Sequence, residues 1–139
     1  MRYALDSNII IDMIRRNSTS FERIDIEKLA GTQIAIPSIV DYEVQRGFYH
    51  TPSSKKECAY RHIKDGCIIL EMNAEILDLA AQIWAKLKST GVTLRGQSGE
   101  LDLLIAAQCL HHGYNTIVTN NIKDFEKIPN LQIENWLEI

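Results

Sequence analysis

The chain has 139 residues, of which 45% are hydrophobic and 24% are charged, and its formal net charge is −3. This length suits one domain with a single core, and we expect residues 1–139 to form one domain. No apolar stretch approaches the roughly 20 residues that a membrane span needs, and the start of the sequence lacks a basic-then-apolar signal pattern. The sequence therefore predicts a cytoplasmic protein that does not associate with membranes.

The net charge bears on nucleic-acid binding, and the cysteines bear on zinc sites and disulfide bonds. The negative total gives no overall basic signature for nucleic acid, but Arg and Lys are concentrated in the first half of the chain. A local basic surface is therefore compatible with the composition. The three cysteines lack CxxC spacing, which favours reduced thiols over a zinc site or disulfide bonds.

In the first half of the chain, short apolar runs alternate with helical patterns. In chain order, the expected elements are a strand at 2–5, a helix at 8–15, a helix at 21–30, a strand at 33–37, a helix from 38 and a helix from about 54 to 64. Ser20, Ser38 and either Ser53 or Ser54 are positioned to cap the helices that follow them.

The alternation continues in the second half. The expected elements are a strand at 66–72, a helix at 74–89 capped by Asn73, a loop with three glycines at 90–99, a helix at 100–112, and strands at 115–119 and 131–136. The apolar run "CIIL" is typical of a strand buried on both faces. Strands alternating with helices predict an α/β domain with a mainly parallel sheet and helices on both faces.

Polar residues follow the ends of the expected strands. They are Asp6, Ser7 and Asn8 after the first strand, Ser38 and Glu43 after the second, and Thr119, Asn120, Asn121 and Asp124 after the strand at 115–119. Asp102, in the first turn of the helix before that strand, precedes the apolar run "LLIAA". Because ligands bind beyond the carboxyl ends of the strands in open α/β sheets, we expect these side chains to share one site.

Several carboxylates at one edge of a sheet repel one another unless a positive group compensates them. Mg²⁺ and Mn²⁺ prefer oxygen ligands, and one or two carboxylates with water suffice for Mg²⁺. Asp6, Glu43 and Asp102 could form such a site, with Asp124 as a further candidate. No His or Cys stands at ligand spacing from them, which favours a hard cation over zinc.

Each acid also has a structural explanation that the sequence leaves open. These alternatives are an N-cap role for Asp6, an ion pair with Arg46 for Glu43, a favourable helix N-terminus for Glu100 and Asp102, and a turn cap for Asp124. Nearby aromatic residues are ambiguous as well. We expect Tyr42, Phe48 and Tyr49 to lie in the core or in a dimer interface rather than to stack on bases.

Four segments, "LDSNIIID", "IPSIVDYEVQRG", "GELDLLIAAQCLHHG" and "VTNNIKDFEKIPNLQIENW", resemble successive signatures of PIN-domain ribonucleases, in the same order. The resemblance is greatest to the VapC-type toxins and covers essentially the whole chain. It implies a PIN-like three-layer α/β/α sandwich. The mainly parallel five-stranded sheet would have the strand order 3-2-1-4-5.

The resemblance also implies a set of site residues and a cofactor. Asp6, Glu43, Asp102 and Asp124 would be catalytic, and Asp6 and Asp102 would bind Mg²⁺ or Mn²⁺. The supporting polar residues would be Asn8, Ser38, Thr119 and Asn121, although Asn121 brings no negative charge. Candidates for contacts with RNA phosphates are Arg15, Arg46 and Arg95, for which a solvated surface position is the alternative.

The implied activity is metal-dependent hydrolysis of RNA phosphodiester bonds, in transfer RNA or another structured RNA, by the toxin of a type II toxin–antitoxin system. Such a toxin inhibits translation. The implied partners are a VapB-like antitoxin, a second copy in a homodimer, and operator DNA bound only through the antitoxin. The alternative is a non-catalytic PIN-like RNA-binding module, which Asn121 favours and the intact Asp6, Glu43 and Asp102 oppose.

Overall fold

The computed structural model describes residues 1–16, 19–93 and 96–137. Its centre is a five-stranded sheet whose neighbouring strands are all parallel. In chain order, the strands are β1 (Arg2–Leu5), β2 (Gln33–Pro37), β3 (Ile68–Leu70), β4 (Thr116–Val118) and β5 (Gln132–Glu134). The spatial order is β3-β2-β1-β4-β5, which confirms the expected topology.

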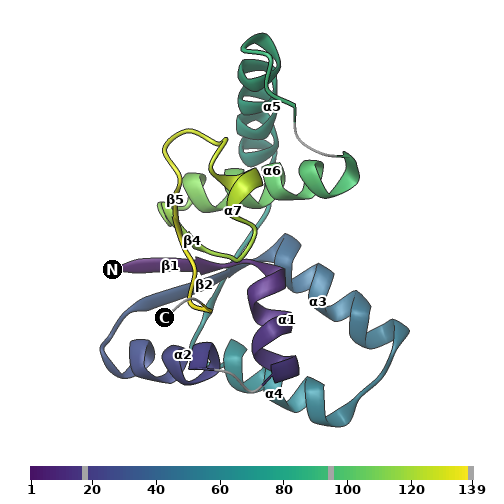
Figure 1. Cartoon of the computed structure of the whole chain (residues 1–139), viewed down its shortest axis with the longest axis vertical. Coiled ribbons are helices and arrows are strands. Elements are labelled where there is room, and N and C mark those ends of the chain that lie inside the picture. The colour runs from purple at the N-terminus through teal and green to yellow at the C-terminus, as the bar shows by residue number, and fades with distance from the viewer. Residues whose placement is uncertain (17–18, 94–95, 138–139) are drawn as a thin grey trace.

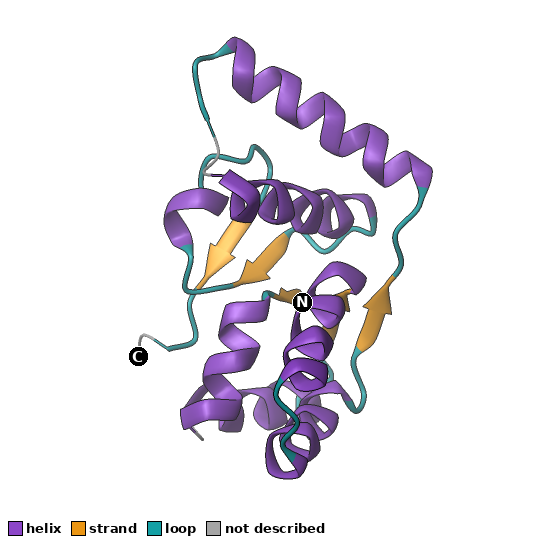
Figure 2. Ribbon diagram, turned by 90° about the vertical axis from the view of Figure 1, so that its right-hand side faces the viewer, coloured by secondary structure: helices purple, strands orange, loops and turns teal. Residues whose placement is uncertain are grey.

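Helices cover both faces of this sheet and make it the middle of three layers (Figure 1). They are α1 (Ser7–Arg16), α2 (Thr19–Leu29), α3 (Ser38–His50), α4 (Ser54–Lys64), α5 (Ala74–Ser89), α6 (Gly96–His111) and α7 (Ile122–Phe125). Figure 2 shows α6 on one side of the sheet with α5 stacked outside it, and the helices of the N-terminal half on the other side. The α/β/α sandwich is therefore confirmed.

The hydrophobic core is built around β1 and its neighbour β2. Ala4 and Leu5 in β1 and Ala35 and Ile36 in β2 are completely buried, because helices cover both faces of these strands. The expectation of a fully buried strand at 66–72 is wrong. β3 is the edge strand beside β2, and Ile68 at its start is 50% exposed because no strand of the described sheet lies on the other side of β3.

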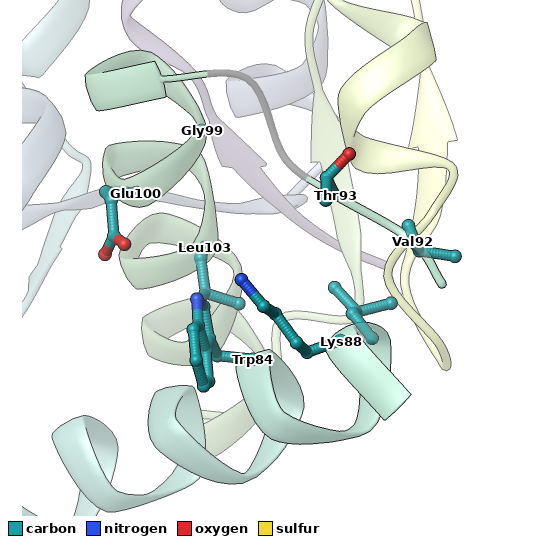
Figure 3. Close-up of a pocket in the computed structure, with 8 residues that line it drawn as sticks. Trp84, Lys88, Val92, Thr93, Gly99, Glu100 and Leu103 are labelled. Carbon is teal, nitrogen blue, oxygen red and sulfur yellow. The ribbon is translucent and has the colours of Figure 1, made fainter. Parts of the chain in front are cut away.

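α5 packs on α6 through the apolar stripe that the sequence predicts. Ile76, Ala80, Ile83 and Leu87 are buried along it. At one end of this contact, Trp84 and Lys88 of α5 lie beside Leu103 of α6, around a cavity of about 80 Å³ (Figure 3). The Lys88 ammonium lies over the Trp84 ring, 5.2 Å from its centroid. This is the geometry of a cation–π interaction.

Two of the expected helix caps are present. The Ser53 hydroxyl accepts from the backbone N–H of Lys56 (3.3 Å), and the Asn73 amide oxygen accepts from that of Ile76 (2.9 Å). Two others are wrong. α2 already begins at Thr19, so Ser20 lies inside the helix, and Pro37 rather than Ser38 occupies the N-cap position of α3.

The loop before α6 is shorter than expected, because the helix begins at Gly96 and includes Gly99. Glycine has a low helix propensity, so the local sequence favoured a later start. The new boundary changes the position of Asp102. It lies nearly two turns into α6 instead of in the first turn.

In the described part of the chain, no helix is both long and apolar enough to cross a bilayer. Cys58, Cys67 and Cys109 are free thiols. Burial raises the pKa of Cys67 to about 11, which keeps that thiol protonated at neutral pH.

A buried glutamine connects α6 to the ends of two strands. Gln108 donates to the Ser38 hydroxyl (2.7 Å) and to the carbonyl of Leu70 (3.0 Å). Its amide oxygen accepts from the backbone N–H of Ile39 (3.3 Å). These bonds fix the start of α3, the helix that carries Glu43, against α6, the helix that carries Asp102.

We predict that Gln108→Leu lowers the free energy of unfolding by about 1–3 kcal/mol, because it leaves buried polar groups without partners. Urea denaturation measures the loss. The exposed Gln82 on α5 bonds only to Asp78 among the described residues, so Gln82→Leu is the matched control and should change stability by less than about 0.5 kcal/mol. Equal effects of the two substitutions would show that the connection is unimportant.

Candidate active site

Asp6 lies between β1 and α1, at the carboxyl edge of the sheet, and is only 2% exposed. One carboxylate oxygen accepts from the backbone N–H of Ser7 (2.8 Å), and the other accepts from the Thr119 hydroxyl (2.8 Å). The Asp6 carbonyl accepts from the N–H of Ile10, so Asp6 does occupy the N-cap position of α1. Its carboxylate, however, makes neither of the usual capping bonds to the second or third helical residue.

Strand pairing explains why Thr119 meets a residue that is distant in sequence. β1 and β4 are neighbours, with Leu5 beside Val118, so the residues that follow these two strands also lie side by side. The Thr119 hydroxyl lies 3.3 Å from the side-chain oxygen of Asn8 as well, and it accepts from the backbone N–H of Asn121 (2.9 Å). Thr119 thus connects β4, α1 and the segment before α7.

Asp102 approaches the same edge from α6 and is 8% exposed. Its carboxylate accepts from the Asn121 side-chain N–H (3.0 Å). Because Asp102 lies nearly two turns into the helix, the positive helix N-terminus, whose effect fades within the first turn, does not explain its position. Asn121 uses its amide to hold a carboxylate of the cluster.

Glu43 and Asp124 are the other two acids. Glu43 lies on α3, and its Oε1 is buried without a hydrogen-bond partner among the described residues. Its Oε2 is 3.9 Å from Arg46, so the expected ion pair exists but is long. Asp124 lies on the short helix α7, where its carboxylate is 3.7 Å from the Lys127 ammonium.

The electrostatics of these acids point to uncompensated negative charge. Burial raises the pKa of Asp6 to about 6 despite its hydrogen bonds from Thr119 and Ser7. Burial also raises the pKa of Asp102 to about 7. The negative charges of Asp6, Asp124 and Glu43 raise the pKa of Asp102 further. The Asp102 carboxylate therefore interacts electrostatically with each of the other three acids. A nearby cation would relieve this repulsion.

The donor set fits a hard divalent cation held mainly by water and by one or two carboxylates. Within the described ranges, no three His, Cys, Asp or Glu side chains are gathered tightly enough to form a complete metal site. Mg²⁺ commonly binds through one or two carboxylates and keeps several waters. Asp6 and Asp102 could supply those carboxylates, and the unpartnered Glu43 Oε1 could accept from a coordinated water.

The remaining candidate residues fall in different places. Ser38 accepts a hydrogen bond from Gln108 and contacts none of the acids through a described hydrogen bond. Arg15 and Arg46 are exposed, and Arg46 lies 5.2 Å from the centroid of the Tyr42 ring. Arg95 lies outside the described residues.

Of the three aromatic residues, Phe48 is confirmed beside the core, and a dimer interface for Tyr42 and Tyr49 stays a prediction. Phe48 packs against the core and lies beside the Tyr60 ring. Tyr42 is 55% exposed and Tyr49 is 86% exposed, so neither is a core residue. Both face outward from α3.

Sequence reasoning missed Gln108, which positions two elements of the site. A signal was present, because Gln108 interrupts the apolar run "LLIAAQCL" of a helix that packs on the sheet. A polar residue in such a position requires hydrogen-bond partners. The sequence alone does not identify those partners.

Comparison with known proteins places this chain and its fold in a family. The family model of the PIN domain matches residues 3–131, and the chain therefore belongs to the PIN-domain family. Over 144 aligned residues, it is 36% identical to Ribonuclease VapC2 of Rickettsia felis, with 98% of both chains covered. It is also 26% identical to the tRNA(fMet)-specific endonuclease VapC of Salmonella typhimurium, again over 98% of both.

The solved structures agree with this assignment. The fold matches the crystal structure of VapBC2 from Rickettsia felis bound to a DNA fragment from its promoter, with a TM-score of 0.81 and 32% identity. The match covers 98% of this chain and 99% of the other. Within the PIN-domain family, the chain is thus of the VapC type.

Proposed function

We propose that this chain, acting as one PIN domain, is a metal-dependent endoribonuclease and the toxin of a type II toxin–antitoxin system. The observation that carries the proposal is the pair of buried carboxylates, Asp6 and Asp102, whose pKa values are raised to about 6 and about 7. Two such groups at the carboxyl edge of a parallel sheet are costly for the fold, and cation binding supplies a reason to retain them.

In this mechanism, Asp6 and Asp102 would hold Mg²⁺ or Mn²⁺, and the cation would polarise a phosphoryl oxygen and lower the pKa of a bound water. Thr119 and the Ser7 N–H fix the Asp6 carboxylate, and Asn121 fixes that of Asp102. Glu43 Oε1, which has no described partner, is available to accept a proton from the attacking water. Water attacks the phosphorus as Glu43 accepts its proton, the P–O bond to the leaving sugar oxygen breaks, and that oxygen takes up a proton from solvent.

Asp124 has a lesser role in this account, because Lys127 already compensates part of its charge. We predict that Asp124→Asn reduces the initial rate of RNA cleavage by about 10–100-fold, as loss of a supporting group commonly does, and by less than Asp6→Asn does. Both variants would be assayed on the same RNA with the same cation. A loss at Asp124 that equals or exceeds the loss at Asp6 would instead make Asp124 a primary ligand.

The relatives support a set of partners for the proposed toxin. The structure from Rickettsia felis contains VapB and VapC together with promoter DNA, which supports a VapB-like antitoxin and contact with operator DNA through it. The Salmonella relative is named as a tRNA-specific endonuclease, which supports transfer RNA as the substrate. A homodimer and a cytoplasmic location complete the proposal.

The proposal is tested by incubating purified protein with transfer RNA and with total RNA. Discrete fragments are expected from the wild type and none from Asp6→Ala, which controls for contaminating nucleases. Fragments that Asp6→Ala also produces would contradict the proposed site. Binding of RNA without any cleavage, by folded protein supplied with Mn²⁺, would favour the non-catalytic RNA-binding module.

A further inference from the structure

A second feature lies directly beside the acids. A cavity of about 250 Å³ opens between α1, α3 and α4, and Glu43 forms part of its wall. Its other walls combine apolar side chains with two cations. They include Ile11, Ile14, Val44, Phe48, Arg15 and Lys56. The proposed catalytic site and this cavity are therefore continuous through Glu43.

A glycine in the last turns of α3 contributes no side chain to this cavity. Gly47 lines the cavity, and a Cβ atom added to it would meet no other atom within 4 Å. Its backbone does not have a positive φ, so the helix does not require glycine for conformational reasons. Glycine also destabilises a helix relative to alanine. Because a Cβ atom would still leave this space open, alanine is compatible with a ligand in the cavity, whereas a large side chain at position 47 would enter the cavity.

The cations of the cavity are available to an anion. In the described part of the chain, Arg15 and Lys56 make no ion pair, whereas Arg46, Lys64 and Lys127 each face an acid. An adjoining cavity of about 300 Å³ between α1 and α4 shares Arg15 and Lys56 and adds Lys55. Arg15, Lys55 and Lys56 therefore form a cationic surface that extends from the cavity beside Glu43 to the start of α4. This surface is positive although the chain as a whole carries a net charge of −3.

We propose that the cavity beside Gly47 binds one nucleotide of the RNA, next to the phosphodiester that is hydrolysed. The base lies against the apolar walls and Phe48, and its flanking phosphates contact Arg15 and Lys56. An apolar ring joined to an anionic phosphate complements apolar walls joined to cations. A single-stranded RNA can turn a base out into such a cavity, which a duplex resists. This inference rests on the proposed ribonuclease function and adds a specificity site to it.

The test compares Gly47→Leu with Gly47→Ala, both in an Asp6→Asn background that prevents cleavage during the measurement. The probe is a fluorescently labelled single-stranded RNA 12-mer of random sequence. Leucine fills the cavity and should weaken binding by about tenfold or more, which is the scale of one lost base contact, whereas alanine should leave affinity within about twofold. Thermal unfolding checks the fold, and both variants should be at least as stable as their parent, because both residues favour a helix more than glycine does.

The salt dependence of RNA binding distinguishes contacts with the phosphates from contacts with the base. Lys56→Gln should lower the slope of log K against log salt by about 0.7, the value for one phosphate contact on a single strand, whereas Gly47→Leu should leave the slope unchanged. In the cleavage-competent protein, Gly47→Leu should change which bonds in transfer RNA are cut. Wild-type affinity and an unchanged fragment pattern in Gly47→Leu would overturn the nucleotide site and leave an apolar protein segment as the occupant. That outcome is distinguishable from failure of the proposed function, in which Asp6→Ala would still cleave RNA.

Discussion

Replacing Asp102 by alanine is expected to reduce RNA cleavage by at least about 100-fold while leaving a folded protein. The factor is a lower bound, since loss of groups that merely support a metal ligand already costs about 10–100-fold. The fold should survive because the substitution removes a carboxylate that repels Asp6, Glu43 and Asp124. The N–H of Asn121 that loses its partner lies on a half-buried side chain, where water can replace the carboxylate.

A matched control exists on the same helix. Glu100 precedes Asp102 by two residues but is exposed, whereas Asp102 is buried. Glu100→Ala should therefore cleave RNA at the wild-type rate. Initial rates on transfer RNA and far-ultraviolet circular dichroism would be measured for both variants. An Asp102→Ala protein with full activity would remove Asp102 from the site.

The second prediction concerns stability and pH. The pKa values of Asp6 and Asp102 in the folded state, about 6 and about 7, exceed the ordinary aspartate value of 3.8. Between about pH 4 and pH 7, the unfolded chain therefore releases protons that the folded chain still holds. These two groups make the protein less stable as the pH rises through this window, and the loss is complete above it.

Asp102→Asn should remove one part of this loss, because the amide has nearly the same shape but no charge. We expect the variant to gain on the order of 2 kcal/mol over the wild type at pH 8 and little at pH 4. Urea denaturation at both pH values gives the difference, in which the contributions of other titrating groups cancel. A variant that is less stable than the wild type at pH 8 would show that the charge of Asp102 is compensated within the chain.

Adding Mn²⁺ should stabilise the wild type more at pH 8 than at pH 5, since the cation requires the ionised carboxylates.

The alternation of apolar strands and helices was sufficient to predict the α/β class, and the resemblance supplied the strand order. The position of β3 at the sheet edge was not predictable from "CIIL", because the same apolar run suits a strand with one neighbour or with two. The start of α6 was misplaced for a similar reason. Gly96 and Gly99 disfavour a helix locally, and only the surrounding structure decides that they belong to one.

The acids of the candidate site were predictable because each follows a strand or lies on a helix that reaches the same edge. Their hydrogen-bond partners were harder to predict. Thr119 donates to Asp6 across 113 positions of the sequence, which only the pairing of β1 with β4 brings about. The role of Asn121 was predicted in general terms, but its bond to Asp102 depends on the path of the segment before α7. The exposure of Tyr42 and Tyr49 depends on which face of α3 meets the core, and the local pattern left that open.

The measurement that tests the central claim most directly is RNA cleavage with a controlled supply of cation. Purified wild-type protein, stripped with EDTA, would be assayed on transfer RNA before and after addition of Mn²⁺ or Mg²⁺, beside Asp6→Asn treated in the same way. We predict no cleavage by the stripped protein, discrete fragments from the wild type after the cation is added, and no comparable recovery for Asp6→Asn. Undiminished cleavage in EDTA, or equal recovery of the variant, would contradict a cation site built on the acids at this edge of the sheet.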